Sequence, residues 1–125
     1  MNVIRALERR VVETPNAVMT TFASPALGGA ARSLWQVRMV PGATGPWHRM
    51  SGDQVWTVLD GGATVESADG HTVLGAGDTA VLPAGELRRL VADPGAGLTA
   101  VVTGDGDARA GLADGTDRGV PEWIA

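Results

Sequence analysis

The sequence contains no cysteine and no lysine. The absence of cysteine excludes disulfide bonds, a thiol nucleophile and a thiolate metal site. All ten basic residues are arginine, so no lysine is present to form a Schiff base with a substrate. No apolar run approaches the length of a membrane-spanning helix, and the charged first twelve residues lack the apolar stretch of a secretory signal. We therefore expect a cytoplasmic protein with no membrane partner.

Charge and length narrow the class of protein further. The formal net charge is −4 and the sequence pI is near 5.0, which disfavours nucleic acid as a partner. Hydrophobic residues make up 44% of the chain and charged residues 19%, which is a globular composition. A chain of 125 residues is long enough to bury one core, so we expect residues 1–125 to form a single domain.

Glycine and proline, with 18 and 7 residues, separate short segments that alternate between apolar and polar side chains. Residues 33–40, for example, place Trp35, Val37 and Met39 on one face. The Asp60–Gly62 segment is expected to turn the chain and so end a strand. Short strands at this spacing predict an all-β fold, either an antiparallel sandwich or a small barrel. The other expected strands are 54–59, 63–67, which pairs with 71–74 in a hairpin across Asp69-Gly70, then 79–82, 86–92 and 98–103.

The two ends of the chain are less regular. Residues 2–12 are compatible with either a strand or a short helix, and the pattern does not decide between them. Residues 104–119 are polar and rich in glycine and aspartate, which predicts a flexible loop. Trp123 and Ile124 are expected to pack on the barrel or on a partner chain.

Two spaced motifs occupy the middle of the chain. The first, at 42–61, is Gly42-x5-His48-x-Met50-x3-Gln54-x6-Gly61, and the second, at 77–92, is Gly77-x5-Pro83-x-Gly85-x2-Arg88-x3-Ala92. Together they resemble the double signature of the cupin superfamily. The resemblance implies a double-stranded β-helix, which is a jelly-roll-like β-barrel. In that family the positions of four of these residues are usually His, His, Glu and His, and they hold one divalent metal; here the four are His48, Met50, Gln54 and Arg88.

The residues at these four positions predict that no metal is bound. A divalent metal site needs several imidazoles or carboxylates, whereas this set offers one imidazole, a thioether and an amide. Arg88 is protonated and has no lone pair to donate. Two like charges about 4 Å apart repel by roughly 4 kcal/mol at an effective dielectric of 20. We therefore expect no metal and no other cofactor.

Period-two geometry predicts which of these side chains share the barrel interior. In this arrangement His48 and Arg88 are the candidate catalytic residues, His48 as a general acid or base and Arg88 as the group that binds an anion. The candidate substrate-binding residues, which supply hydrogen bonds and an apolar surface for a ring, are Met50, Gln54, Trp56 and Leu90. The alternative is a decayed site, in which Arg88 extends to solvent and His48 bonds Gln54 or a carbonyl.

Three functions remain open. The first is a metal-independent cupin that binds a small anionic or aromatic, polyketide-like ligand and catalyses proton transfer, cyclisation or isomerisation. It resembles small single-domain cupins encoded alongside bacterial natural-product pathways, some of which act as cyclases. The second is a non-catalytic module that binds or senses a ligand. The third is a metal-dependent dioxygenase or isomerase with unusual ligands. Cupins of this size commonly pair through N-terminal strands, so the resemblance also implies a homodimer.

Overall fold

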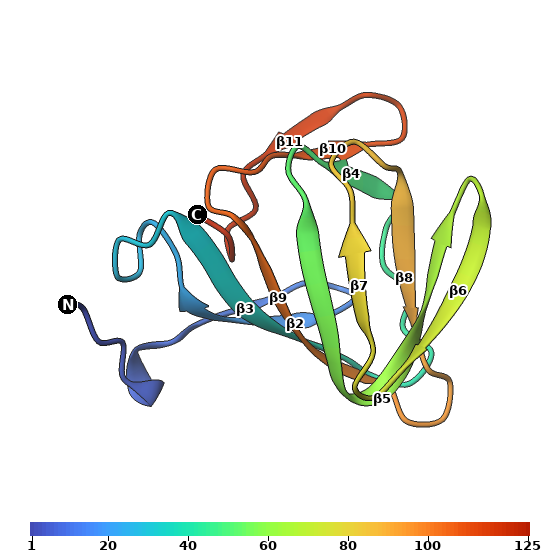
Figure 1. Ribbon diagram of the computed structural model, residues 1–125, viewed down its shortest axis with the longest axis horizontal. Coiled ribbons are helices and arrows are strands. Elements are labelled where there is room, and N and C mark those ends of the chain that lie inside the picture. Colours follow the sequence, from blue (N-terminus) through green and yellow to red (C-terminus); the bar gives the residue numbers. More distant parts are fainter.

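The computed structural model describes all 125 residues and shows an all-β domain (Figure 1). Its strands curl into a barrel-like sheet in which neighbouring strands are antiparallel. The elements are the short 3-10 helix η1 (Ala6–Glu8) and the strands β1 (Arg10–Glu13), β2 (Val18–Ala23), β3 (Arg32–Met39), β4 (His48–Met50), β5 (Gln54–Ser67), β6 (Gly70–Gly75), β7 (Thr79–Leu82), β8 (Arg88–Ala92), β9 (Leu98–Asp105), β10 (Ala110–Leu112) and β11 (Asp117–Gly119).

The long strand β5 joins the two halves of the sheet. Its first half pairs with β7 and β9, and its second half pairs with β6 and β8. Between the halves lies Gly61, with a φ of +70° and a carbonyl oxygen of Gly97 where a Cβ would sit. The expected turn at Asp60–Gly62 is therefore wrong. A register shift next to Gly61 bends the strand, so the strand continues from one half of the barrel into the other.

The inward faces predicted from alternation are confirmed. Trp35, Val37 and Met39 are buried along β3, and the residues between them are more exposed. β5 and β6 form the expected hairpin, but its two turn residues are Ala68 and Asp69 instead of Asp69 and Gly70, so Ser67 lies opposite Gly70. The order through the sheet is β1-β2-β3-β9-β5-β8-β4-β10-β11. This order brings β8 between β5 and β4, so the two sequence motifs meet on neighbouring strands.

The N-terminal end contains both a short helix and a strand, the two structures that the sequence pattern left open for residues 2–12. Residues 6–8 form η1, and β1 follows it and pairs with β2 alone. Figure 1 shows this end projecting from the barrel, and Leu7 and Val11 are exposed there. The homodimer stays a prediction; β1 is one of the strands with an unpaired edge. None of the helical structure in the chain has the length and hydropathy that a membrane span needs.

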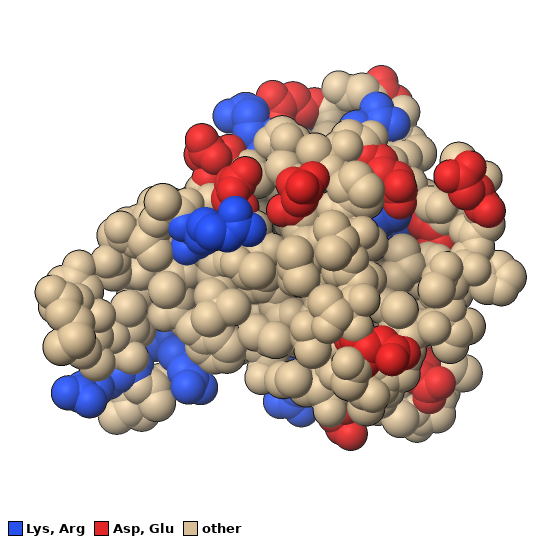
Figure 2. Space-filling view, in the orientation of Figure 1, with Lys and Arg blue, Asp and Glu red and all other residues tan.

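The C-terminal end is packed against the barrel. Residues 104–119, expected as a loop, contain the two short strands β10 and β11, and β10 pairs with β4. Ile124 is 1% exposed, so of the two expected packing sites it occupies the barrel of its own chain. The backbone carbonyls of residues 123–125 accept hydrogen bonds from the hydroxyls of Thr21, Ser33 and Ser24. Charged side chains of both signs are spread over the face in Figure 2, with uncharged surface between them.

Candidate functional site

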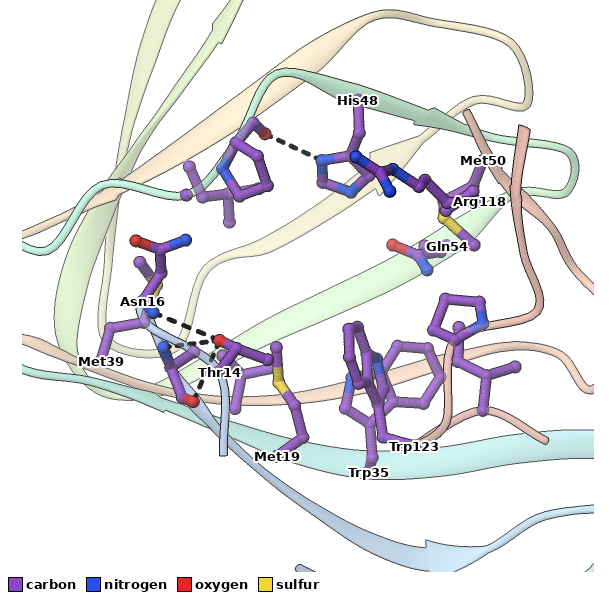
Figure 3. Close-up of a pocket in the computed structure, with 18 of the residues that line it drawn as sticks. Thr14, Asn16, Met19, Trp35, Met39, His48, Met50, Gln54, Arg118 and Trp123 are labelled. Atoms are coloured by element: carbon purple, nitrogen blue, oxygen red, sulfur yellow. Dashed lines mark hydrogen bonds between the residues drawn. The ribbon is translucent and has the colours of Figure 1, made fainter. Parts of the chain in front are cut away.

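The barrel contains a cavity of about 510 Å³ that opens between the curled sheet and the C-terminal end. In Figure 3, His48, Gln54, Met50 and Arg118 lie along one side of the cavity, and Trp35, Trp123 and Met19 lie along the opposite side. Five of the six predicted site residues line the cavity, namely His48, Met50, Gln54, Trp56 and Leu90. The sixth, Arg88, does not.

His48 lines the cavity with its neutral tautomer defined by one hydrogen bond. Its Nδ1 lies 2.9 Å from the carbonyl oxygen of Pro46. Because a carbonyl oxygen can only accept, Nδ1 carries the hydrogen and Nε2 keeps its lone pair in the neutral ring. Burial lowers the pKa of His48 below 6.5; the hydrogen bond to Pro46 opposes this, and the charge of Arg88 adds to the lowering. At neutral pH the cavity therefore contains an uncharged base.

Gln54 is held in one orientation by two donors. Its Oε1 accepts a hydrogen bond of 2.7 Å from Arg88 Nη2 and one of 3.2 Å from Trp56 Nε1. Guanidinium and indole groups can only donate, so the amide oxygen must face them. The Gln54 amide nitrogen makes no hydrogen bond within the protein, and Gln54 lines the cavity, so this N–H is available to a ligand. This wall thus combines an acceptor, His48 Nε2, with an N–H donor.

Arg88 lies behind Gln54. The side chain is 0% exposed, so the alternative in which it extends to solvent is wrong. Its Nε and Nη1 groups have no hydrogen-bond partner and no carboxylate pairs with it. Burial lowers the pKa of Arg88 to about 10, with an opposing contribution from Glu86, so the group is a cation at neutral pH. In this position Arg88 orients the Gln54 amide instead of touching a ligand.

The four positions that hold a metal in the resemblance do not fit one here. His48 Nε2 is the single strong donor. The Gln54 oxygen already accepts two hydrogen bonds, Met50 offers a thioether, and Arg88 adds a positive charge behind them. Nowhere in the chain do three or more His, Cys, Asp or Glu side chains come together as a metal-binding group.

Sequence reasoning missed most of the opposite wall. Trp35 was expected to face inward, and alternation in β3 signalled that position but not its place in a cavity. Met19 and Asn16 come from β2 and the segment before it, where no motif marks them. Arg118 comes from residues 104–119, whose composition predicted a loop, and Trp123 was expected to pack on the barrel or on a partner chain but not to line a cavity.

The family assignment follows from comparison with known proteins. The model of the cupin domain family matches residues 35–108, which is more than half of the chain and includes both motifs. The chain is a cupin. No curated protein matches the sequence. Among solved structures, the polyketide cyclase RemF from Streptomyces resistomycificus has a TM-score of 0.71 at 20% identity, covering 84% of this cupin and 79% of that chain.

Other solved structures share this fold. KdgF from Halomonas sp. has a TM-score of 0.67 at 20% identity, covering 84% of this cupin and 94% of that chain. A cupin-like protein from Thermotoga maritima has a TM-score of 0.66 at 20% identity, covering 74% and 70%. Similarity at this level of identity establishes the cupin barrel and leaves the chemistry to the site itself.

Proposed function

We propose that this cupin binds a small, flat, oxygen-bearing ligand and transfers a proton on it without a metal. The observation that carries the proposal is that His48 and Gln54 both line the cavity, while the Nε2 of His48 and the amide nitrogen of Gln54 make no hydrogen bond within the protein. A base beside a hydrogen-bond donor is the minimum needed to form an enolate from a carbonyl compound. The ligand remains within a largely apolar cavity, which excludes water from the reacting atoms.

The proton-transfer step balances with these two groups alone. His48 Nε2 removes a proton from the carbon next to the carbonyl, and the electron pair of that C–H bond moves onto the carbonyl oxygen. The Gln54 N–H donates a hydrogen bond to this developing enolate. The imidazolium then returns the proton to the same or a different carbon, which gives exchange or isomerisation. If the enolate carbon attacks a second carbonyl of the same molecule, the result is a ring.

The substrate class we favour is aromatic or polyketide-like. Trp35 and Trp123 line the apolar wall, where a flat ring would stack. Structural similarity to a polyketide cyclase supports the same substrate class at the level of the fold. The poor set of metal donors supports a reaction in which the protein side chains act alone.

The experiment that tests this proposal is deuterium exchange at C1 of 2-tetralone, a bicyclic ketone, followed in D2O by proton NMR. The expected result is exchange faster than in buffer alone, on the order of 100-fold per bound ketone, which is at the low end for general base catalysis. His48→Gln should abolish the acceleration and His71→Gln, on the exposed β6, should retain it. Equal exchange in the wild type and His48→Gln would contradict the proposal.

A non-catalytic ligand-binding cupin is the second candidate, and the largely apolar lining of the cavity favours it. The same ketone separates the two. A ligand-binding module would show thermal stabilisation by 2-tetralone, because ligand bound to the folded state shifts unfolding, with no faster exchange. An enzyme would show both effects.

A further inference from the structure

The cavity has a charge that the proposed function does not use. Among its lining residues are no aspartate and no glutamate, and His48 is neutral at neutral pH. Arg118 is the one lining residue that carries a permanent charge. The charge of the cavity lining therefore favours a negatively charged ligand.

The strand that carries Arg118 is anchored on both sides. In β11, Asp117 forms an ion pair of 3.0 Å with Arg109 and also accepts a hydrogen bond of 2.7 Å from the Gly119 backbone. β11 pairs with β10, and β10 pairs with β4, which carries His48. Figure 3 shows the Arg118 side chain reaching over the cavity at the wall formed by His48 and Gln54.

The Arg118 guanidinium has no carboxylate partner within hydrogen-bond distance. The three ion pairs of the protein join other residues, and the neighbouring Asp117 is taken up by Arg109. Asp114 is the carboxylate whose titration Arg118 influences. Hydrogen bonds from Thr116 are the main cause of the lowered pKa of Asp114, and the charge of Arg118 is the smallest contribution. Asp114 is fully exposed, so its field at Arg118 is screened by solvent.

We propose that Arg118 binds the ionised acid group of the ligand, and that the ligand is an aromatic hydroxy acid with its carboxylate next to its hydroxyl. This inference rests on the proposed function, since it assigns the ligand of the same cavity. The hydroxyl would donate to His48 Nε2 and accept from the Gln54 N–H, while the carboxylate receives charge-assisted hydrogen bonds from the Arg118 guanidinium. The ring would then lie against the aromatic wall opposite.

The test compares 3-hydroxy-2-naphthoic acid with its methyl ester, which has the same ring and hydroxyl but no charge. Dissociation constants are measured by fluorescence titration at low ionic strength. The wild type should bind the acid about three- to tenfold more tightly than the ester, as expected for a charge-assisted contact at a partly exposed rim. Arg118→Gln should remove this preference, and Arg118→Lys should restore part of it.

The matched control is Arg38→Gln, which removes the same charge from an exposed position on β3 away from the cavity. It should keep the preference for the acid. Raising the salt concentration should reduce the preference in the wild type, since the contact is partly exposed. 2-Naphthol, which has the hydroxyl without the acid, should bind wild type and Arg118→Gln alike.

The outcomes separate this inference from the proposed function. If acid and ester bind the wild type equally, or if the preference survives in Arg118→Gln, the role of Arg118 is wrong while the cavity remains a ligand site. If none of the naphthalene compounds binds, both the role of Arg118 and the aromatic ligand class fail. 2-Tetralone contains no acid group, so its deuterium exchange tests the role of His48 independently of Arg118.

Discussion

Arg88 and Arg89 are consecutive residues of β8 that occupy opposite environments. Arg89 points outward, pairs with Glu66 and lies 5.1 Å from the centroid of the Trp47 ring, with a third of its side chain exposed. Arg88 points inward, is 0% exposed and has a single hydrogen bond, to the neutral amide of Gln54. The comparison shows that strand alternation turned one arginine into a surface ion pair and its neighbour into an internal support for the site.

The internal position is the costly one. A buried cation with two unsatisfied N–H groups loses hydration that no partner replaces. What Arg88 provides in return is orientation, because its hydrogen bond helps to fix which end of the Gln54 amide faces the cavity. The difference between the two arginines can be tested by substitution, beginning with the stability of the folded protein.

Arg88→Ala should lower the free energy of unfolding by about 2–4 kcal/mol, because it leaves a cavity and removes a hydrogen bond at a fully buried site. Arg89→Ala, at a partly exposed site, should cost less than about 1 kcal/mol. Urea denaturation of both variants measures the difference. Equal losses would show that burial does not distinguish the two residues.

Arg88→Met separates the packing role from the orienting role. A methionine fills much of the space without a charge, and replacing buried charge by apolar volume is often neutral for stability. This variant should therefore unfold near the wild-type urea concentration and still bind 2-naphthol more weakly, because Gln54 loses its fixed orientation. Arg89→Met should leave the binding unchanged.

Gln54→Glu gives Arg88 the carboxylate partner that Arg89 already has. The stability should be maintained or raised by the new ion pair. Binding of 2-naphthol should fall by about tenfold, because a carboxylate oriented by Arg88 has no N–H to donate to the cavity. Fluorescence titration measures the binding, and unchanged affinity would show that the Gln54 N–H does not contact the ligand.

The stability of the protein should depend on pH through His48, whose pKa is lowered mainly by burial and further by the charge of Arg88. The pKa of His48 is lower in the folded protein than the ordinary value near 6.5 of an unfolded chain. Between these two values the unfolded state binds more protons, so stability rises with pH and is lost as pH falls through this window. His48→Gln should remove this part of the pH dependence of urea unfolding.

Substitutions of the two arginines should differ in their effect on the pKa of His48. Arg88→Met should raise the pKa of His48 in an NMR titration, though only in part, because burial is the larger cause. Arg89→Met should leave that pKa where it is. A His48 pKa equally changed by both substitutions would contradict the assignment of the effect to Arg88.

The smallest effect is expected for the outer pair. A double-mutant cycle of Arg89→Ala and Glu66→Ala should give a coupling energy of about 0.2–1 kcal/mol, since both side chains are about a third exposed and screened by solvent. The coupling should shrink further at high salt. A coupling above that range would place Arg89 among the structurally important groups and weaken the contrast with Arg88.

The sequence correctly predicted which side chains of a strand point into the barrel, but not how far each lies from the cavity. The period of two correctly predicted that Gln54, Arg88 and Leu90 point inward, because the alternation of side chains depends only on the strand itself. It could not show that Gln54 stands in front of Arg88, since that depends on the pairing of β8 with both β5 and β4. The cupin resemblance supplied the barrel but placed all four motif residues at one site.

Two other differences have local physical reasons. Gly61 is a turn former by composition, yet in a strand paired along its whole length a left-handed glycine produces a bend. Arg118 lies in a segment of glycine and aspartate that has no apolar alternation, so nothing in the sequence indicated that the pairing of β11 with β10, and of β10 with β4, would bring it to the cavity. Long-range pairing decided both positions.

The hydrogen bonds that hold residues 123–125 against the barrel have a thermodynamic consequence. Trp123 and Ile124 form part of the cavity wall, and the hydroxyls that hold them, on Thr21 and Ser33, are about a hundred residues away in the sequence. A ligand that stacks on Trp123 must therefore favour the docked tail over the released one. By reciprocity the docked tail must favour the ligand by the same factor. Ligand affinity is consequently coupled to the docking of the C-terminal tail on β2 and β3, through the hydrogen bonds that hold the tail there.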